Sequence, residues 1–333
     1  MTRRIILDCD PGHDDAVAIL LALASAEVEL LGLTVVGGNV KLASTVLNAR
    51  KVVTLSGCAG VGIYAGCPRP MMREMVTAEH VHGETGLDSG TGTLLAEPTV
   101  PLAEQHAVNY IIDTVRGSEK GEITLVATGP LTNVAVAFAM APDIIDHLKE
   151  LVIMGGAGFE PGNITPAAEF NIYVDPHAAA AVFASGVRLT VFGLDVTHQM
   201  RITPPRLAQI GKAGRVGETL ADLLDFFNRY DISKYGWDGA PLHDPCTIAW
   251  LIKPDLFEGK PMHVVVDTVD GPSLGRTVTD WFAVTGQAPN TTVITTGDAD
   301  GFFNLTAERV ATCLLYTSPS PRDQRGSRMP SSA

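Results

Sequence analysis

The chain has 333 residues, of which 46% are hydrophobic, and this is enough to bury a large core. Its formal net charge of −13 argues against nucleic-acid binding, because proteins that bind nucleic acids carry basic surfaces that meet the phosphates. Its five cysteines include no CxxC pair, which argues against a disulfide framework or a zinc site.

The N-terminal residues do not form a secretion signal, because only three apolar residues separate Arg4 from Asp8. The longest apolar run, from Ala16 to Ala26, is too short to span a bilayer. We therefore expect a cytoplasmic protein that does not contact membranes.

A dense group of acids follows the first predicted strand. A strand is expected over Arg4–Leu7 and a helix over Ala16–Ala26, with Pro11 and Gly12 forming the turn between them. The acids near this turn are Asp8, Asp10, Asp14 and Asp15. Crowded carboxylates raise one another's pKa unless a cation neutralises them, and an all-oxygen site selects Ca²⁺ or Mg²⁺. One acid such as Asp14 could simply cap the helix, but capping does not explain four. The cluster therefore predicts a divalent-metal site.

Strand-like and helix-like segments alternate along the rest of the chain. The further strands are expected at Leu30–Val36, Ile123–Ala127, Leu151–Met154, Arg188–Phe192 and His263–Val266. The further helices are expected at Leu42–Ser56, Glu104–Arg116, Leu131–Ala139, Pro176–Ala184 and Gly217–Tyr230. This alternation is typical of an open, mostly parallel, doubly wound α/β sheet with helices on both faces. We expect a single domain over residues 1–312.

Other polar groups lie in otherwise apolar surroundings, and each has a plainer alternative. Asn39 could be a turn residue, and His80 and His82 could be solvated loop histidines. Asp244, between His243 and Pro245, could cap a helix that has proline at its first position. The remaining group suits a sugar site, because amides and a carboxylate beside an apolar wall can hold hydroxyls: Asn163, Glu169, Phe170 and Asn171.

The C-terminal segment, residues 313–333, has a different composition. It is rich in serine and proline and ends basic, so we expect it to be disordered. Its first part, CLLYTSPSPRD from Cys313 to Asp323, resembles the translation of a sequencing adapter. This predicts that the native reading frame ends near Thr312, which resequencing the gene would test.

Together, the motifs resemble the inosine–uridine nucleoside hydrolase family. They follow the family's order and span the chain to about residue 310: DCDPGHDDAVAIL (Asp8–Leu20), GGN (Gly37–Asn39), HVHGETG (His80–Gly86), TGPLTN (Thr128–Asn133), MGG (Met154–Gly156), GNITPAAEFNIYVDP (Gly162–Pro176), GLDVTHQ (Gly193–Gln199) and HDP (His243–Pro245). The N-terminal motif is the most specific. The resemblance implies hydrolysis of the N-glycosidic bond of ribonucleosides to base and ribose.

The resemblance also implies a role for each site residue. Ca²⁺ would be held by Asp10, Asp15, Asp244 and the backbone carbonyl of Thr128, together with two ribose hydroxyls and a water that Asp10 deprotonates. His243 would protonate the leaving base, and His82 would flank the base with it. The sugar would be bound by Asp14, Asn39, Met154, Asn163, Glu169, Phe170 and Asn171. His13 would have a structural or outer-shell position, and no role is assigned to Tyr230, Tyr235 or Trp237.

The resemblance further suggests a homotetramer or dimer and an inosine/uridine-type or pyrimidine-leaning preference. Two rival functions remain. Asp8-x-Asp10 after a strand resembles an aspartate-nucleophile phosphatase, although that class expects Thr or Val soon after the second aspartate. A non-catalytic nucleoside- or ribose-binding protein would use the same pocket, and an assay for free ribose separates it from a hydrolase.

Overall fold

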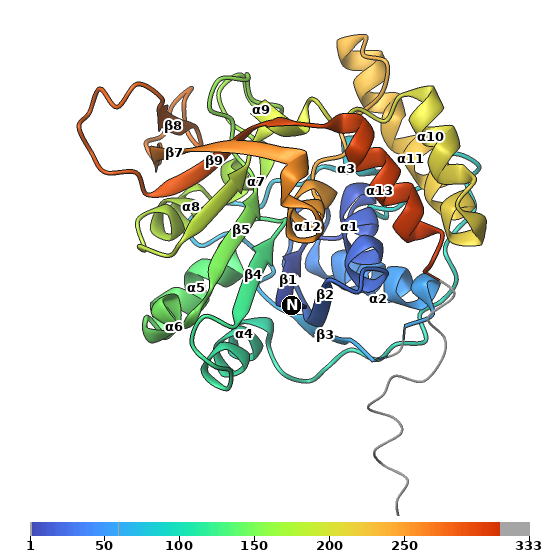
Figure 1. The fold of residues 1–333 in the computed structure, drawn as a ribbon, viewed down its shortest axis with the longest axis horizontal. Helices are drawn as coiled ribbons and strands as arrows, with labels where there is room; N and C mark the ends of the chain where they lie inside the picture. The colour runs from blue at the N-terminus through green and yellow to red at the C-terminus, as the bar shows by residue number, and fades with distance from the viewer. Residues whose placement is uncertain (1, 59, 314–333) are drawn as a thin grey trace, which may run out of the picture.

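The computed structural model describes residues 2–58 and 60–313, and a nine-stranded sheet forms the centre of this part (Figure 1). The strand order is β3-β2-β1-β4-β5-β6-β9-β7-β8. The strands from β3 to β9 in this order pair in parallel, whereas β7 pairs antiparallel with both β9 and β8. The strand bounds are β1 Arg3–Cys9, β2 Val28–Val35, β3 Gly62–Ala65, β4 Ile123–Ala127, β5 Glu150–Met154, β6 Leu189–Phe192, β7 Phe257–Val266, β8 Thr277–Asp280 and β9 Thr291–Gly297. The predicted mostly parallel α/β sheet is confirmed.

Helices cover both faces of the sheet (Figure 1). One core contains side chains of α1 His13–Leu23, α2 Leu42–Ser56, α10 Pro204–Gly211, α11 Gly214–Tyr235, α12 Pro245–Ile252 and α13 Ala299–Val310. The opposite core contains side chains of α4 Ala107–Arg116, α5 Thr132–Met140, α6 Asp143–His147 and α8 Pro176–Phe183. Short helical turns complete the fold: α3 Glu79–His82, α7 Phe170–Val174, α9 Leu194–Thr197 and the 3₁₀ turn Pro254–Leu256.

Strand β1 is buried on both sides. Ile5 and Leu7 belong to one core and Ile6 to the other, because successive side chains of a strand point to opposite faces. Asp8 is fully buried and accepts hydrogen bonds from Thr34 of β2 (2.6 Å) and Asn133 of α5 (2.8 Å). The first aspartate of the motif therefore ties two strands and a helix together.

The chain changes direction at β1, and this creates a crevice. From β1 it continues through β2 to β3 on one side, then returns to β4 on the other side and moves on to β5 and β6. The connections after β1 and after β4 therefore diverge at the carboxyl ends of these neighbouring strands. Open α/β sheets bind ligands at such a switch point.

Several element boundaries differ from those expected. Strands β3, β8 and β9 were not predicted, and β7 begins at Phe257 rather than His263. Helix α1 begins at His13 rather than Ala16, so it includes the last two acids of the first motif. Cys313, the first residue of the expected tail, is buried in the core, and the rest of that segment lies outside the described residues. All five cysteines are free.

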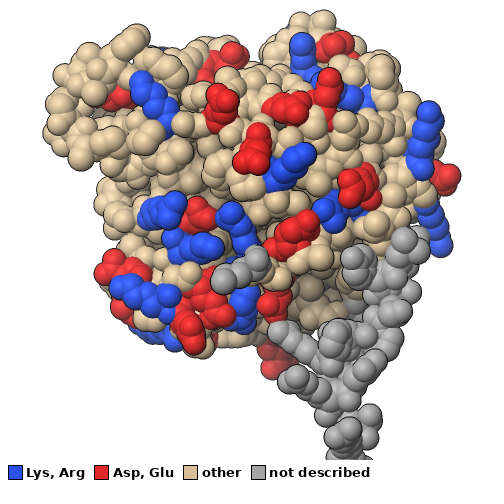
Figure 2. Space-filling model, viewed as in Figure 1, with Lys and Arg blue, Asp and Glu red and all other residues tan. Residues whose placement is uncertain are grey.

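The outer surface is mixed in charge on the face that Figure 2 shows, where acidic and basic side chains alternate. Charged side chains of the described residues also pair, as Arg4 does with Glu122 (2.6 Å) and Arg116 with Asp143 (2.6 Å). Within the described part of the chain, no helix combines the length and apolar character needed to cross a membrane.

Candidate active site

The acidic cluster lies at the switch point, where four carboxylates from two distant parts of the chain converge. Asp10 follows β1, Asp14 and Asp15 lie in the first turn of α1, and Asp244 precedes α12. Helices α1 and α12 pack against each other, which brings the two segments together. Oxygens of Asp14, Asp15 and Asp244 lie within 4.8 Å of one another. The metal ligands predicted from the sequence include Asp10, whereas this group of three includes Asp14 instead.

Helix capping accounts for a contact of Asp15 but not for the whole cluster. Gly12 is the N-cap of α1, and Asp15 rather than Asp14 accepts the hydrogen bond from its backbone N–H (3.0 Å). Asp244 occupies the N-cap position of α12 with Pro245 after it, yet its side chain makes no capping bond. The Asp244 carboxylate is thus free to join the cluster, and helix capping does not explain its position.

Burial and mutual repulsion raise the pKa of every acid in the cluster. The pKa of Asp14 rises to about 7, chiefly by burial and then by Asp15. Burial also raises the pKa values of Asp10 and Asp244 well above their ordinary range, and nearby carboxylates add to both shifts. Among the described residues, no Lys or Arg forms an ion pair with these acids. The cluster therefore lacks a cationic partner from the chain.

Asp10 has one carboxylate oxygen that is satisfied and one that is not. Its Oδ2 accepts from the backbone N–H of Asn39 (2.7 Å), whereas its Oδ1 is buried without a hydrogen-bond partner. Two glycines make room for it. A Cβ at Gly38 would lie 2.0 Å from Asp10 Oδ2, and one at Gly129 would lie 2.6 Å from Oδ1. The Gly-Gly-Asn and Thr-Gly-Pro motifs thus let neighbouring strand ends approach Asp10 closely.

Asn39 and Thr128 support the cluster from β2 and β4. The amide of Asn39 donates to the backbone oxygen of Asp10 (3.1 Å), so Asn39 does more than form a turn. The hydroxyl of Thr128 donates to Asp15 Oδ1 (2.8 Å). Its backbone oxygen, a predicted metal ligand, accepts from Asn171 Nδ2 (2.7 Å). A carbonyl oxygen has two lone pairs, so this bond leaves one for another partner.

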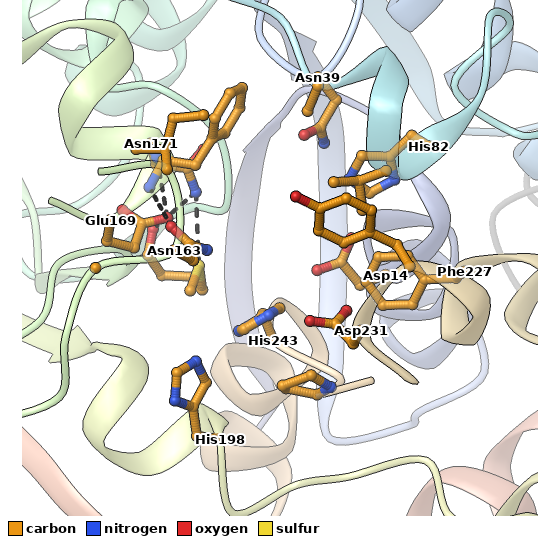
Figure 3. A pocket seen from close by; sticks show the side chains of 18 of the residues that line it. Asp14, Asn39, His82, Asn163, Glu169, Asn171, His198, Phe227, Asp231 and His243 are labelled. Atoms are coloured by element: carbon orange, nitrogen blue, oxygen red, sulfur yellow. Dashed lines mark hydrogen bonds between the residues drawn. The ribbon is translucent and has the colours of Figure 1, made fainter. Parts of the chain in front are cut away.

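The expected sugar-binding residues line the same cavity (Figure 3). Asn171 also donates to the backbone oxygen of Met154 (3.2 Å), and Asn163 Oδ1 accepts from the backbone of Phe170 (2.9 Å). Glu169 is the N-cap of α7, and its carboxylate accepts three backbone N–H bonds of 2.9–3.1 Å, one of them from Gly156. Its burial nevertheless raises its pKa to about 7. These contacts hold the side chains rigidly around the cavity.

His13 and His82 form a hydrogen-bonded pair beside the cluster. His13 Nε2 lies 2.7 Å from the backbone oxygen of Asp88, which can only accept, so this nitrogen carries a proton. Burial lowers the pKa of His13 to about 4, which leaves its Nδ1 unprotonated at neutral pH. The two Nδ1 atoms lie 3.1 Å apart, and His82 Nδ1 would donate in this contact. The His13 backbone N–H donates to the same His82 nitrogen at 3.4 Å, and in this contact His82 Nδ1 accepts. The two contacts therefore use opposite protonation states of His82 Nδ1.

His243 lies on another side of the cavity. Its Nδ1 is 2.8 Å from the hydroxyl of Thr197, and burial lowers its pKa to about 3. Its ring lies at an angle to that of His198, with centroids 6.1 Å apart. His198 in turn contacts Glu160 (3.2 Å) and the ring of Trp237 (5.0 Å). At neutral pH the His243 ring is uncharged and can still donate one hydrogen bond.

Several cavity residues were not assigned from the sequence. Helix α11 contributes Phe227, Tyr230, Asp231 and Tyr235, and the turn after it contributes Trp237. Phe227 stacks on His82 (5.3 Å), and Tyr235 stacks on Trp237 (4.8 Å). The signal available was an i, i+4, i+8 spacing on one helix face, but a helix that packs on a core shows the same spacing. His198 lay within a quoted motif, which could have marked it.

Comparisons with known proteins agree with one another. The sequence model described as inosine-uridine preferring nucleoside hydrolase matches residues 5–304. The chain is 46% identical over 310 residues to a pyrimidine-specific ribonucleoside hydrolase, RihB, of Escherichia coli, covering 92% of this chain and 97% of that protein. It is 45% identical over 308 residues to an uncharacterized protein of Schizosaccharomyces pombe, covering 92% and 98%.

Solved structures of nucleoside hydrolases also resemble this chain. A purine-preferring ribonucleoside hydrolase from Gardnerella vaginalis superposes with a TM-score of 0.86 at 33% identity, covering 93% of this chain and 99% of that one. A plant nucleoside hydrolase does so with a TM-score of 0.86 at 32% identity, covering 96% and 100%. The relative from Escherichia coli is named for pyrimidine nucleosides, whereas the one from Gardnerella vaginalis is named for purine nucleosides.

Proposed function

This chain belongs to the inosine-uridine preferring nucleoside hydrolase family and is a ribonucleoside hydrolase, and on that premise we propose that it acts on pyrimidine nucleosides through a calcium-dependent site. The observation that carries the proposal is the buried carboxylate cluster. Its Asp14 and Asp244 line the cavity that holds the sugar-binding amides, and Asp10 Oδ1 has no hydrogen-bond partner. The pyrimidine preference rests on the relative from Escherichia coli.

The residues present fit a hard divalent cation. All candidate metal-ligating atoms are oxygens, which hard divalent cations prefer. The charge of these carboxylates has no cationic partner among the described side chains. One buried oxygen, Asp10 Oδ1, has no hydrogen-bond partner. We assign the ligands to Asp10, Asp15, Asp244 and the backbone oxygen of Thr128. Bound there, Ca²⁺ would lower the pKa of a water molecule and orient the ribose hydroxyls.

Asp10 is the proposed general base. Its free Oδ1 is available to accept the proton of the water that attacks C1′ of the ribose. Burial among acids favours the protonated form of Asp10, so it can act as a base only when nearby positive charge lowers its pKa. The catalytic role of Asp10 and the need for a cation are therefore linked.

The sugar is proposed to bind between the two sides of the cavity. Asp14 and Asn39 approach it from the β1 and β2 side, and the amide of Asn171 approaches from α7. Asn163 and Glu169 are proposed to bind its 5′-hydroxyl, with Met154 and Phe170 packing against the ring. Cleavage of an N-glycosidic bond develops positive charge on the ribose, and these acids stabilise that charge.

The departing base is proposed to lie between His82 and His243. Because its ring is neutral in the free site, His243 donates a hydrogen bond to the base, and it acts as a full general acid only after taking up a proton. His82 is proposed to flank the base on the other side of the cavity.

The experiment that tests the proposal measures free ribose. Protein dialysed against EGTA is incubated with uridine, cytidine, inosine and adenosine, and Ca²⁺ is then restored. We expect ribose only after Ca²⁺ is added, and the pyrimidine nucleosides to be cleaved fastest. Full activity after exhaustive chelation would overturn the calcium site, and absence of ribose from every substrate would overturn the hydrolase. Asp10→Asn should abolish the activity that Ca²⁺ restores.

A homo-oligomer, dimer or tetramer, is also proposed. Val265 and Val278 are register partners on β7 and β8, and both are exposed. Phe282 and Val284 next to β8 are 81% and 83% exposed. Apolar side chains grouped in this way are typical of a subunit interface. Light scattering should give a mass of two or four chains, and a monomer at micromolar concentration would contradict the proposal.

A further inference from the structure

Asp231 is a buried acid in the cavity to which the proposed mechanism assigns no role. It lies on α11, is 9% exposed, and lines the cavity. Figure 3 shows its carboxylate turned towards the cavity, between His243 and Phe227. Within the described part of the chain, no hydrogen bond or ion pair involves its carboxylate, and Lys234 acts on it only through its charge.

A structural role does not account for this side chain. Asp231 lies inside a helix of 22 residues, where it caps neither end. The Lys234 ammonium donates instead to the hydroxyl of Tyr230 (2.5 Å) and lies over the rings of Tyr230 and Tyr235. The Asp231 carboxylate lines the cavity without a protein hydrogen-bond partner, so it is available to a ligand that enters the cavity.

The neighbours of Asp231 suit a flat heterocycle. Phe227 precedes it by one helical turn and Tyr235 follows it by one turn, so the three side chains lie on one face of α11. Phe227 stacks on His82, and Tyr235 stacks on Trp237. Aromatic rings therefore stand on both sides of Asp231, where the edge of a base that enters between them would meet the carboxylate.

We propose that Asp231 reads the edge of the base and selects nucleosides whose base presents an amino group, so that cytidine is favoured over uridine. This rests on the proposed function, because it assigns a role within the same site. An ionised carboxylate only accepts hydrogen bonds. The 4-amino group of cytosine donates to it, whereas uracil presents the O4 acceptor at that position, and its N3–H lies between two carbonyl oxygens that repel the carboxylate.

The ionisation state of Asp231 agrees with this role. Burial raises its pKa to about 6, with Lys234 acting in the opposite direction, so the side chain is ionised at pH 8. A site built around a buried acceptor discriminates strongly against a ligand that lacks the donor, because the acceptor is then left unpaired.

The test compares cytidine with uridine in the calcium-loaded protein at pH 8, using the ratio of their kcat/KM values. Asp231→Asn keeps the shape but adds an amide donor, which can bond to O4 of uracil. We expect this variant to lower the cytidine-to-uridine ratio by at least about tenfold. The intrinsic difference between the two leaving groups cancels, because it is the same in both proteins. Asp231→Ser, which also donates, should shift the ratio in the same direction if the amide variant does not fold.

Asp225→Asn is the matched control. It removes an acid from the same helix, but Asp225 is exposed and pairs with Arg229 (2.9 Å), so the ratio should not change. An unchanged ratio in both Asp231 variants would overturn the inference while leaving the hydrolase intact. If the wild-type protein cleaves no nucleoside, the proposed function fails instead.

Discussion

At the scale of single residues, the site depends on acids and histidines that are held in uncharged forms by burial. The pKa values of Asp10, Asp14 and Asp244 are raised, while those of His82 and His243 are lowered. Burial favours the uncharged form of each group, although Asp14, with a pKa of about 7, is partly ionised at neutral pH. The sequence identified these residue types and their grouping, but their protonation states follow from packing that the sequence does not reveal.

Replacing His243 by Ala tests its role at the leaving group. We expect kcat on uridine to fall by about 100-fold, because removal of a general acid or a transition-state donor costs 10²–10⁴. Nitrophenyl riboside should lose far less, since its leaving group departs without a proton. Steady-state kinetics on the two substrates make the comparison.

Thr197→Ala is a useful companion variant, because it removes only the hydroxyl that contacts His243 Nδ1. Thr197→Ala should lower kcat on uridine by less than His243→Ala does, and again more than kcat on nitrophenyl riboside. Equal losses on uridine and nitrophenyl riboside in His243→Ala would contradict the leaving-group role.

At the scale of elements, the strand ends position the carboxylates of the cluster. Gly38 after β2 and Gly129 after β4 face the two oxygens of Asp10 so closely that a methyl group on either would collide with it. These glycines are therefore required by packing against the carboxylate as well as by the turns. The sequence placed them in motifs but could not show what they face.

Gly129→Ala should displace the Asp10 carboxylate. We expect calcium affinity to fall by at least about tenfold and kcat by about 100-fold, because a misplacement of about 1 Å costs that much. Isothermal titration calorimetry and ribose release measure the two effects. Gly60→Ala is the control, since a Cβ there meets nothing within 4 Å. Wild-type calcium affinity in Gly129→Ala would refute this steric argument.

The elements found from the sequence were those with continuous apolar runs. Strands β1, β4 and β5 are buried on both faces, and their pattern predicts them directly. Strands β3 and β9 were missed, because the first has four residues and the second, TTVITTG, is rich in threonine. The start of β7 was missed because residues 258–261 are exposed and include Pro261, which is typical of strands near a sheet edge.

At the scale of the whole molecule, the buried titratable groups couple stability to pH in opposite directions. Acids with a raised pKa bind protons more tightly in the folded state, so their contribution is lost as pH rises through the folded pKa. Histidines with a lowered pKa act the other way, but their effect is complete above about pH 6.5, their unfolded value. Above that pH, the acids alone determine the slope. The acids concerned are Asp8, Asp14 and Glu169, each with a pKa of about 7, and Asp10, Asp15 and Asp244, whose pKa values are also raised by burial.

We therefore expect the melting temperature of the EGTA-treated protein to fall between pH 6.5 and pH 8. Added Ca²⁺ should remove this slope at the cluster and stabilise the protein at pH 8 by about 2.7 kcal/mol at 100 times its Kd. Scanning calorimetry with and without Ca²⁺ measures both effects. A metal-free protein that becomes more stable from pH 6.5 to pH 8 would show that the cluster is not protonated as described.

The alternation of strand-like and helix-like segments predicted the class of sheet but not the order of its strands. The alternation predicted a parallel sheet, but the reversal at β1 and the antiparallel pair β7–β8 depend on long-range packing. The site at the switch point followed from the general rule for such sheets. The contribution of α11 to the cavity could not be predicted, because in the sequence a helix face that lines a cavity looks the same as one that packs on a core.

The carboxylates that converge at the switch point come from distant parts of the polypeptide, with Asp10, Asp14 and Asp15 near its start and Asp244 much later. During translation, the first three acids are therefore synthesised long before Asp244. Until Asp244 is synthesised, no fragment of the chain holds the full set of charges.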